Sequence, residues 1–161
     1  MYQHPLSNIE LLTWLTHHKD IPPLLGGVYS RDTLPKKQHY SPALYIVNTA
    51  PASHPTGIHW IAMLIGNGTS EYFDSLGHKP CHEFRDFLGP HYVYCRERLQ
   101  SLSALSCGYY CLYYAVCRAQ HLSFDRIVQD LYNSDDHSVM HSVQQIQPLK
   151  VVTGSGIKRC L

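Results

Sequence analysis

Residues 57–74 read GIHWIAMLIGNGTSEYFD, two apolar runs on either side of Asn67-Gly68. Runs of this composition are typical of strands, and an Asn-Gly pair between them is a strong signal for a two-residue hairpin turn. With these two residues in the turn, Ile61 faces Asp74 across the ladder. The stretch therefore predicts an antiparallel hairpin of defined register.

This register brings a histidine and a carboxylate together. His59 lies two residues before Ile61 and on the same face, so His59 and Asp74 are diagonal neighbours with backbones roughly 7 Å apart. Glu71 points to the opposite face because side chains alternate along a strand, although a longer turn would reverse that choice. An imidazole held by a carboxylate is half of a nucleophilic catalytic apparatus.

The other half is a nucleophile, and Cys107 is the candidate. It precedes Gly108 at the start of a predicted helix, where the helix dipole and a neighbouring imidazolium both stabilise a thiolate. Cys111, one turn inside that helix, is expected to be inert. Gln100 offers an uncharged amide donor for a developing oxyanion, with the backbone N–H of Cys107 as its partner. Together these residues indicate acyl-transfer chemistry.

The remaining elements surround this hairpin and helix. Capping signals and apolar spacing predict helices, in chain order, at 8–18, 81–88 and 107–118, followed by two helices capped by Ser123 and Asp136. Strands are expected at 28–29, 43–48, 59–65, 71–74 and 91–95. The predicted class is α+β: a central mixed sheet packed against the buried helix that carries Cys107, with flanking helices. Residues 1–150 form one domain, and 151–161 a flexible tail.

The composition of the 161-residue chain excludes several classes of function. Thirteen basic and twelve acidic side chains leave a net charge of +1, so no strong field favours nucleic acid or a membrane surface. Its longest apolar run, 107–117, is too short to span a bilayer, and nothing at the start reads as a secretory signal. We expect a protein that is neither membrane-bound nor secreted. No second cysteine pair accompanies Cys107 and Cys111, and we predict no metal site.

Several segments in order along the chain resemble adenain, the adenovirus maturation protease. Residues 45–50 (YIVNTA) and 57–63 resemble the segments around the catalytic histidine of that family, and 72–77 (YFDSLG) the strand that holds its acid. Gln100 and the segment 107–111 (CGYYC) resemble its glutamine and cysteine segments, and 25–29 its early loop. The likeness spans residues 24–118.

The resemblance implies an α+β cysteine-protease fold and a role for each residue. His59 is then the general base, Asp74 its orienting acid, Gln100 an oxyanion-hole donor and Cys107 the nucleophile. The implied activity is that of a monomeric viral cysteine endopeptidase that cleaves capsid or core precursors at Gly-containing sites. It would work in the host nucleus or cytoplasm during infection, and in the virion.

Two departures from the adenain pattern support an alternative. The chain is shorter than adenain, and Asp74 stands where adenain commonly has glutamate, whereas the related SUMO and ubiquitin-like-protein proteases use aspartate. Those relatives place one fewer residue between the glutamine and the cysteine and lack the stretch 46–50, which favours adenain. A third alternative is an inactive protease fold that serves as a binding module, but the set of catalytic residues is complete.

The tail adds a hypothesis about activation. Residues 152–156 (VTGSG) approximate an adenain cleavage site, and 156–161 (GIKRCL) resemble the basic, cysteine-bearing peptide that activates adenain. By this resemblance, Cys160 forms a disulfide with Cys95 or Cys81 and docks the tail, in the same molecule or in another; a disordered basic tail is the alternative. Adenain is also stimulated by DNA, but this chain is less basic, and we expect at most weak DNA contact.

Overall fold

The computed structural model describes residues 4–36, 42–66 and 68–146. Its helices are α1 (Asn8–His17), the 3-10 turn η1 (Arg31–Thr33), α2 (His82–Leu88), α3 (Cys107–Ala119), α4 (Phe124–Tyr132) and α5 (Asp136–Gln145). Its strands are β1 (Leu25–Ser30), β2 (Ala43–Asn48), β3 (Trp60–Ile65), β4 (Ser70–Phe73) and β5 (Tyr92–Tyr94). Each predicted helix and strand is present.

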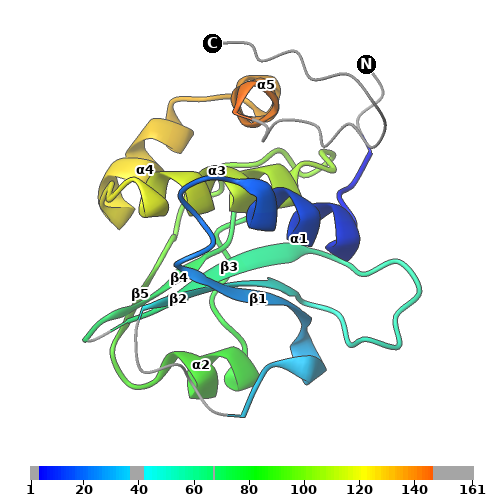
Figure 1. Ribbon diagram of the computed structural model, residues 1–161, viewed down its shortest axis with the longest axis vertical. Coiled ribbons are helices and arrows are strands. Elements are labelled where there is room, and N and C mark those ends of the chain that lie inside the picture. Colours follow the sequence, from blue (N-terminus) through cyan, green and yellow to red (C-terminus); the bar gives the residue numbers. More distant parts are fainter. Residues whose placement is uncertain (1–3, 37–41, 67, 147–161) are drawn as a thin grey trace, which may run out of the picture.

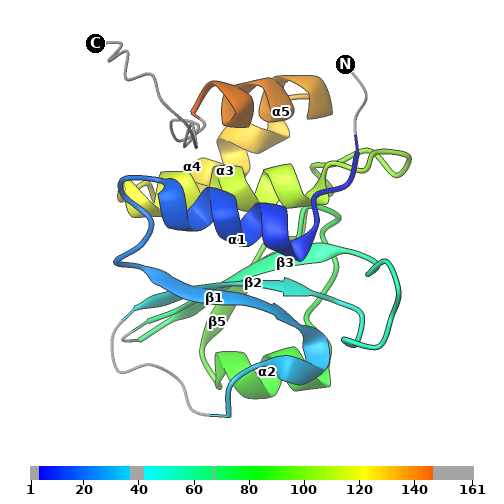
Figure 2. The same ribbon diagram turned by 45° about the vertical axis from the view of Figure 1, so that its right-hand side comes forward.

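The strands form one mixed sheet in the order β1-β2-β3-β4-β5 (Figures 1 and 2). The pairs β2/β3 and β3/β4 are antiparallel, whereas the outer pairs β1/β2 and β4/β5 are parallel. Helices α1, α3, α4 and α5 lie on one side of this sheet and α2 on the other. The predicted α+β class, with a central mixed sheet and flanking helices, is confirmed.

The two central strands carry apolar side chains on both faces because helices cover the sheet on both sides. In β2, Leu44 and Ile46 belong to the core that contains α1 and α3, whereas Tyr45 and Val47 belong to the smaller core beside α2. All six residues of β2 and all six of β3 are buried. This rigid centre positions the residues that leave the ends of β3 and β4.

The hairpin has the predicted register. Ala62 pairs with Phe73, and Met63 with Tyr72, as a two-residue turn requires. Asn67 itself lies outside the described residues. His59 therefore directly precedes β3, and Asp74 directly follows β4.

Helix starts agree with the sequence except at α2, which begins at His82 with Cys81 as its cap, and at α5. Ser7 and Glu10 form the expected capping box of α1, and Ser123 caps α4 by accepting a bond from the N–H of Arg126. The cap of α5 is Asp135, not Asp136, because Asp135 has the extended backbone of a cap and accepts the N–H of Ser138.

The first strand is also longer than expected, because its pairing with β2 extends it across the two glycines that read as a loop. Among the described residues, no helix is sufficiently long and apolar to cross a membrane.

Candidate active site

His59 and Asp74 meet at the ends of the hairpin strands. Nε2 of His59 donates to Oδ1 of Asp74 at 2.7 Å, and the two residues are only 9% and 1% exposed. The carboxylate accepts, so the proton of the neutral imidazole resides on Nε2 and Nδ1 keeps its lone pair. The buried ring therefore presents a basic nitrogen on its far side.

The Asp74 carboxylate is itself held in a tight turn. Oδ1 also accepts the backbone N–H of Leu76 at 2.8 Å, and Nδ1 of the exposed His78 lies 3.5 Å from Oδ2. Gly77 closes the turn with a φ of +74°, and a Cβ at this position would come within 2.8 Å of the Glu97 backbone. Only glycine fits this positive φ and close approach without strain.

Cys107 is the first residue of α3 and lies next to His59. Its side chain is buried and lies close enough to the His59 ring to raise the pKa of that ring. Because Nε2 is taken by Asp74, Nδ1 is the nitrogen left for the thiol. At the first position of a helix the N–H of Cys107 has no acceptor within the helix, so it points out of the helix end.

The environment of His59 favours its protonated form. Burial lowers the pKa of His59, but the hydrogen bonds with Asp74 and Cys107 and the charges of both partners outweigh it and raise the pKa to about 9. An imidazolium at this position stabilises a neighbouring thiolate. The geometry thus supports a Cys–His pair oriented by an acid.

Gln100 is buried and its amide is held at both ends. Oε1 accepts the Ser75 hydroxyl at 2.8 Å, and Nε2 donates to the carbonyl of Ala104 at 2.7 Å. The Gln100 backbone N–H also bonds the carbonyl of Ser75 at 3.0 Å. An amide nitrogen has two N–H groups, so Nε2 keeps one donor beyond Ala104.

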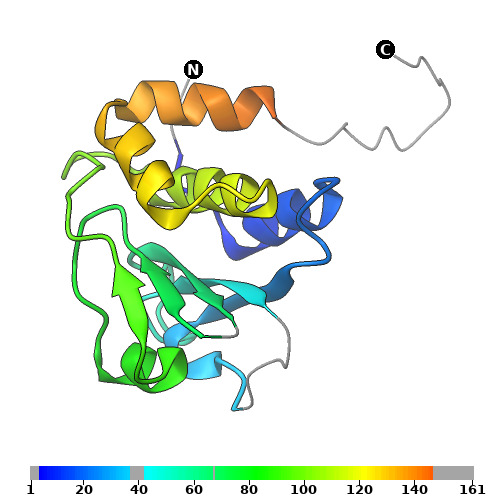
Figure 3. The ribbon, with the colours of Figure 1, turned by 90° about the vertical axis from the view of Figure 1, so that its left-hand side faces the viewer.

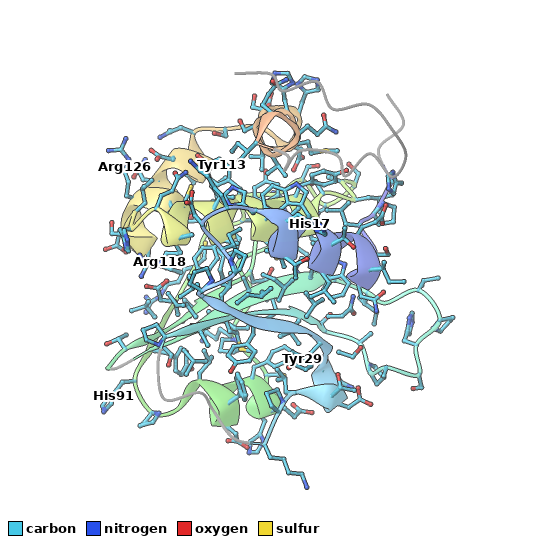
Figure 4. The ribbon with its side chains drawn as sticks, in the orientation of Figure 1. His17, Tyr29, His91, Tyr113, Arg118 and Arg126 are labelled. Carbon is cyan, nitrogen blue, oxygen red and sulfur yellow. The ribbon has the colours of Figure 1, made fainter. Side chains whose placement is uncertain are left out.

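Glu71 lies on the opposite face of β4, as the alternation of the strand predicts. Its carboxylate accepts from the Tyr114 hydroxyl and pairs with Nε of Arg118 at 3.0 Å. Both partners lie on α3, and Figure 4 labels Arg118. It is therefore part of the contact between the sheet and α3.

A pocket of about 290 Å³ lies beside the His59–Asp74 pair. Its lining includes the pair itself and, from the α2 side of the sheet, Tyr72, Cys81 and Phe84. Within residues 4–36, 42–66 and 68–146, no three His, Cys, Asp or Glu side chains gather where they could hold a metal ion.

The other described cysteines, Cys81, Cys95, Cys111 and Cys117, are free thiols. Burial raises the pKa of Cys95 and of Cys117 to about 11, and that of the wholly buried Cys111 well above its ordinary value. Cys81 is exposed, whereas Cys95 is buried and donates to the carbonyl of Glu97. Cys160, the predicted disulfide partner of one of these two, lies outside the described residues.

The structure thus brings all four residues of the predicted set to one end of the sheet and of α3. Sequence reasoning missed Ser75, which orients Gln100, although it directly follows Asp74. It also missed the contacts of Asp136 with the segment between Gln100 and Cys107. No local signal marks either contact, because the partners are distant in sequence.

A mixed sheet packs against a helix that begins at Cys107, and the His59–Asp74 pair lies at the end of that sheet. The chain matches the crystal structure of the ASFV pS273R protease with a TM-score of 0.62 and 15% identity, over 89% of this chain and 67% of that one. A selenomethionine form of that protease matches with a TM-score of 0.50 and 20% identity, over 67% and 44% of the two chains. No protein-family model and no curated protein matches the sequence. The chain therefore has the fold of this protease.

Proposed function

We propose that the protein is a cysteine endopeptidase whose catalytic domain is residues 1–150. The observation that carries the proposal is the position of His59, which donates to Asp74 through Nε2 at 2.7 Å and lies close enough to Cys107 for that side chain to raise its pKa. A buried base between an orienting acid and a thiol at a helix start has the geometry of a Cys-His-Asp hydrolase. The likeness to a protease fold supports the same reaction class.

The reaction would proceed in two halves. In the first, Nδ1 of His59 takes the thiol proton, and the Cys107 sulfur forms a bond to the carbonyl carbon of the substrate. The resulting oxyanion accepts hydrogen bonds from Nε2 of Gln100 and the N–H of Cys107. His59 then gives its proton to the leaving amine as the C–N bond breaks. This leaves a thioester on Cys107.

In the second half, water attacks the thioester. His59 takes a proton from that water, the tetrahedral species collapses, and the carboxylic acid product leaves as Cys107 recovers its proton. Asp74 holds the ring orientation and offsets the imidazolium charge in both halves, without itself taking a proton.

For the substrate, we propose precursor proteins of a virus, cleaved at Gly-containing sites during virion maturation. The segments that resemble adenain, and the fold shared with an ASFV protease, support this choice. The enzyme would act as a monomer in the infected cell and in the virion, with DNA at most a weak contact. The second candidate is a SUMO or ubiquitin-like-protein protease, which Asp74 favours as the acid.

The tail hypothesis belongs to the same proposal. Residues 151–161 would act as an activating peptide through a disulfide between Cys160 and Cys81 or Cys95. The exposure of Cys81 makes its thiol the more accessible of the two. Mass analysis without reductant tests the disulfide, and active enzyme with all six thiols free would contradict it.

Hydrolysis of a fluorogenic Leu-Arg-Gly-Gly peptide by the 161-residue chain tests the activity. We expect cleavage by the wild type, no cleavage by Cys107→Ala, and wild-type cleavage by Cys117→Ala, which removes another thiol of α3. A Cys160→Ala variant measures the contribution of the tail. Ubiquitin-like fusion proteins, offered beside peptides with internal Gly-containing sites, separate the two substrate classes. Cleavage that persists in Cys107→Ala would contradict the mechanism, and an inert wild type would favour a binding module.

A further inference from the structure

Asp136 links the two ends of the segment that separates Gln100 from Cys107. Its Oδ2 accepts the backbone N–H of Ser101 at 3.2 Å, and its Oδ1 accepts the hydroxyl of Ser106 at 3.0 Å. Ser101 directly follows Gln100, and Ser106 directly precedes Cys107. One carboxylate is therefore bonded to the neighbours of both residues that would form the oxyanion hole.

The same segment also holds the Gln100 amide directly. The carbonyl of Ala104 accepts from Nε2, so a displacement of residues 101–106 would move this donor. Tyr110, one turn into α3, bonds the carbonyl of Leu99, just before Gln100, at 3.1 Å. Burial raises the pKa of Tyr110, and the charge of Asp136 raises it further. All these contacts constrain one short loop.

The carboxylate is carried by a helix that is fixed to the nucleophile helix. Asp136 is the first residue of α5, whose Val139, Met140 and Val143 are buried in the core shared with α3. Figure 3 shows α5 lying across α3 on the side away from the sheet. A carboxylate is also favoured at a helix N-terminus by the helix dipole. The anchor is therefore packed on the helix that begins at Cys107.

From this arrangement we infer that Asp136 is a positioning residue that sets the distance between the amide of Gln100 and the N–H of Cys107. The inference rests on the proposed function and adds α5 to the elements that build the oxyanion hole. Electrostatic stabilisation of an oxyanion depends on donors held in place before the reaction, so loosening the loop would weaken the transition state more than substrate binding.

The test compares Asp136→Ala with Asp135→Ala. Asp135 directly precedes Asp136 and is the N-cap of α5. With the Leu-Arg-Gly-Gly substrate, we expect Asp136→Ala to lower kcat about tenfold or more and to change KM little. The rate at which iodoacetamide alkylates Cys107 should stay at the wild-type value, because that reaction forms no oxyanion. Asp135→Ala should lower the melting temperature and leave kcat unchanged.

Two further variants separate positioning from folding. Ser106→Ala removes one of the two bonds without changing a charge and should give a smaller loss of kcat. In a Gln100→Ala background, Asp136→Ala should cause little further loss, because its effect passes through Gln100.

Wild-type kcat in Asp136→Ala, an equal loss in Asp135→Ala, slower alkylation of Cys107, or losses that multiply in the double variant would each overturn the inference. A wild type without hydrolysis would instead overturn the proposed function, and the inference with it.

Discussion

The hydroxyl of Ser75 lies 2.8 Å from Oε1 of Gln100, and both residues are buried. The Ser75 carbonyl also accepts the N–H groups of Leu99 and Gln100. Because Ser75 directly follows Asp74, one turn of the chain holds both the proposed acid and the proposed oxyanion donor. The Ser75 hydroxyl donates to Oε1, so the oxygen of the Gln100 amide faces Ser75 and Nε2 faces away from Ser75.

Ser75→Ala is therefore expected to lower activity although all four proposed catalytic residues are unchanged. It leaves a buried carbonyl oxygen without its donor, which costs about 1–3 kcal/mol of stability, and it lets the Gln100 amide turn. We expect kcat for the Leu-Arg-Gly-Gly peptide to fall about tenfold, as positioning contacts can produce. Ser103→Ala, at an exposed site, is the control. Unchanged kcat in Ser75→Ala would show that the amide is oriented by other groups.

Gln100→Ala should cost more, because it removes the donor itself. A loss of about a hundredfold or more in kcat is expected, as for other oxyanion-hole donors. Alkylation of Cys107 by iodoacetamide should proceed at the wild-type rate, since the thiol and His59 are unaltered. The exposed Gln120→Ala is a matched control. Equal kcat in Gln100→Ala and wild type would show that Gln100 does not stabilise the oxyanion.

Substitutions of the two acids of the hairpin, Asp74 and Glu71, should have different effects on kcat and on the melting temperature. Asp74→Asn removes the charge that orients His59, and we expect kcat to fall about a hundredfold or more. Glu71→Gln removes the charge that pairs with Arg118 and should lower the melting temperature while kcat stays near the wild-type value. Steady-state kinetics and thermal unfolding of both variants test this. A greater loss of kcat in Glu71→Gln than in Asp74→Asn would show that Glu71, and not Asp74, is the acid that orients His59.

The raised pKa of His59 predicts a pH-dependent stability. In the folded protein this pKa is about 9, above its ordinary value of 6.5, so folding favours the protonated ring. The stabilisation is complete below about pH 6.5 and is lost as the pH rises through about 9, for a total of up to about 3 kcal/mol. Urea unfolding of wild type and His59→Gln at pH 6 and pH 9.5 measures it. A constant difference between the two proteins would contradict the assignment.

The same ionisation should limit activity at high pH. Loss of the His59 proton above about pH 9 removes the acid that protonates the leaving amine, so kcat/KM should fall there. A pH profile of kcat/KM with the peptide substrate checks this. A rate that continued to rise past pH 10 would require another proton donor.

Local patterns predicted most of the secondary structure and the contact at the centre of the site. The Asn-Gly turn and the two apolar runs define a ladder in which Ala62 faces Phe73, and this register alone brings His59 to Asp74. The capping signals placed α1 and α4 because a cap bonds residues only three positions away. At α5 the sequence predicted Asp136 as the cap, and only the backbone identifies the preceding Asp135 as the cap.

Residues 57–74 determine the hairpin and its register, because side chains alternate strictly and the turn length sets the pairing. Contacts between distant segments were decided by the packing of whole elements. Ser75 reaches Gln100 across 25 positions, and Asp136 reaches Ser101 across 35, only because α3 and α5 pack on one another and the turn after β4 meets the loop before α3. Such contacts depend on the assembled core, since no short-range pattern of residues encodes them.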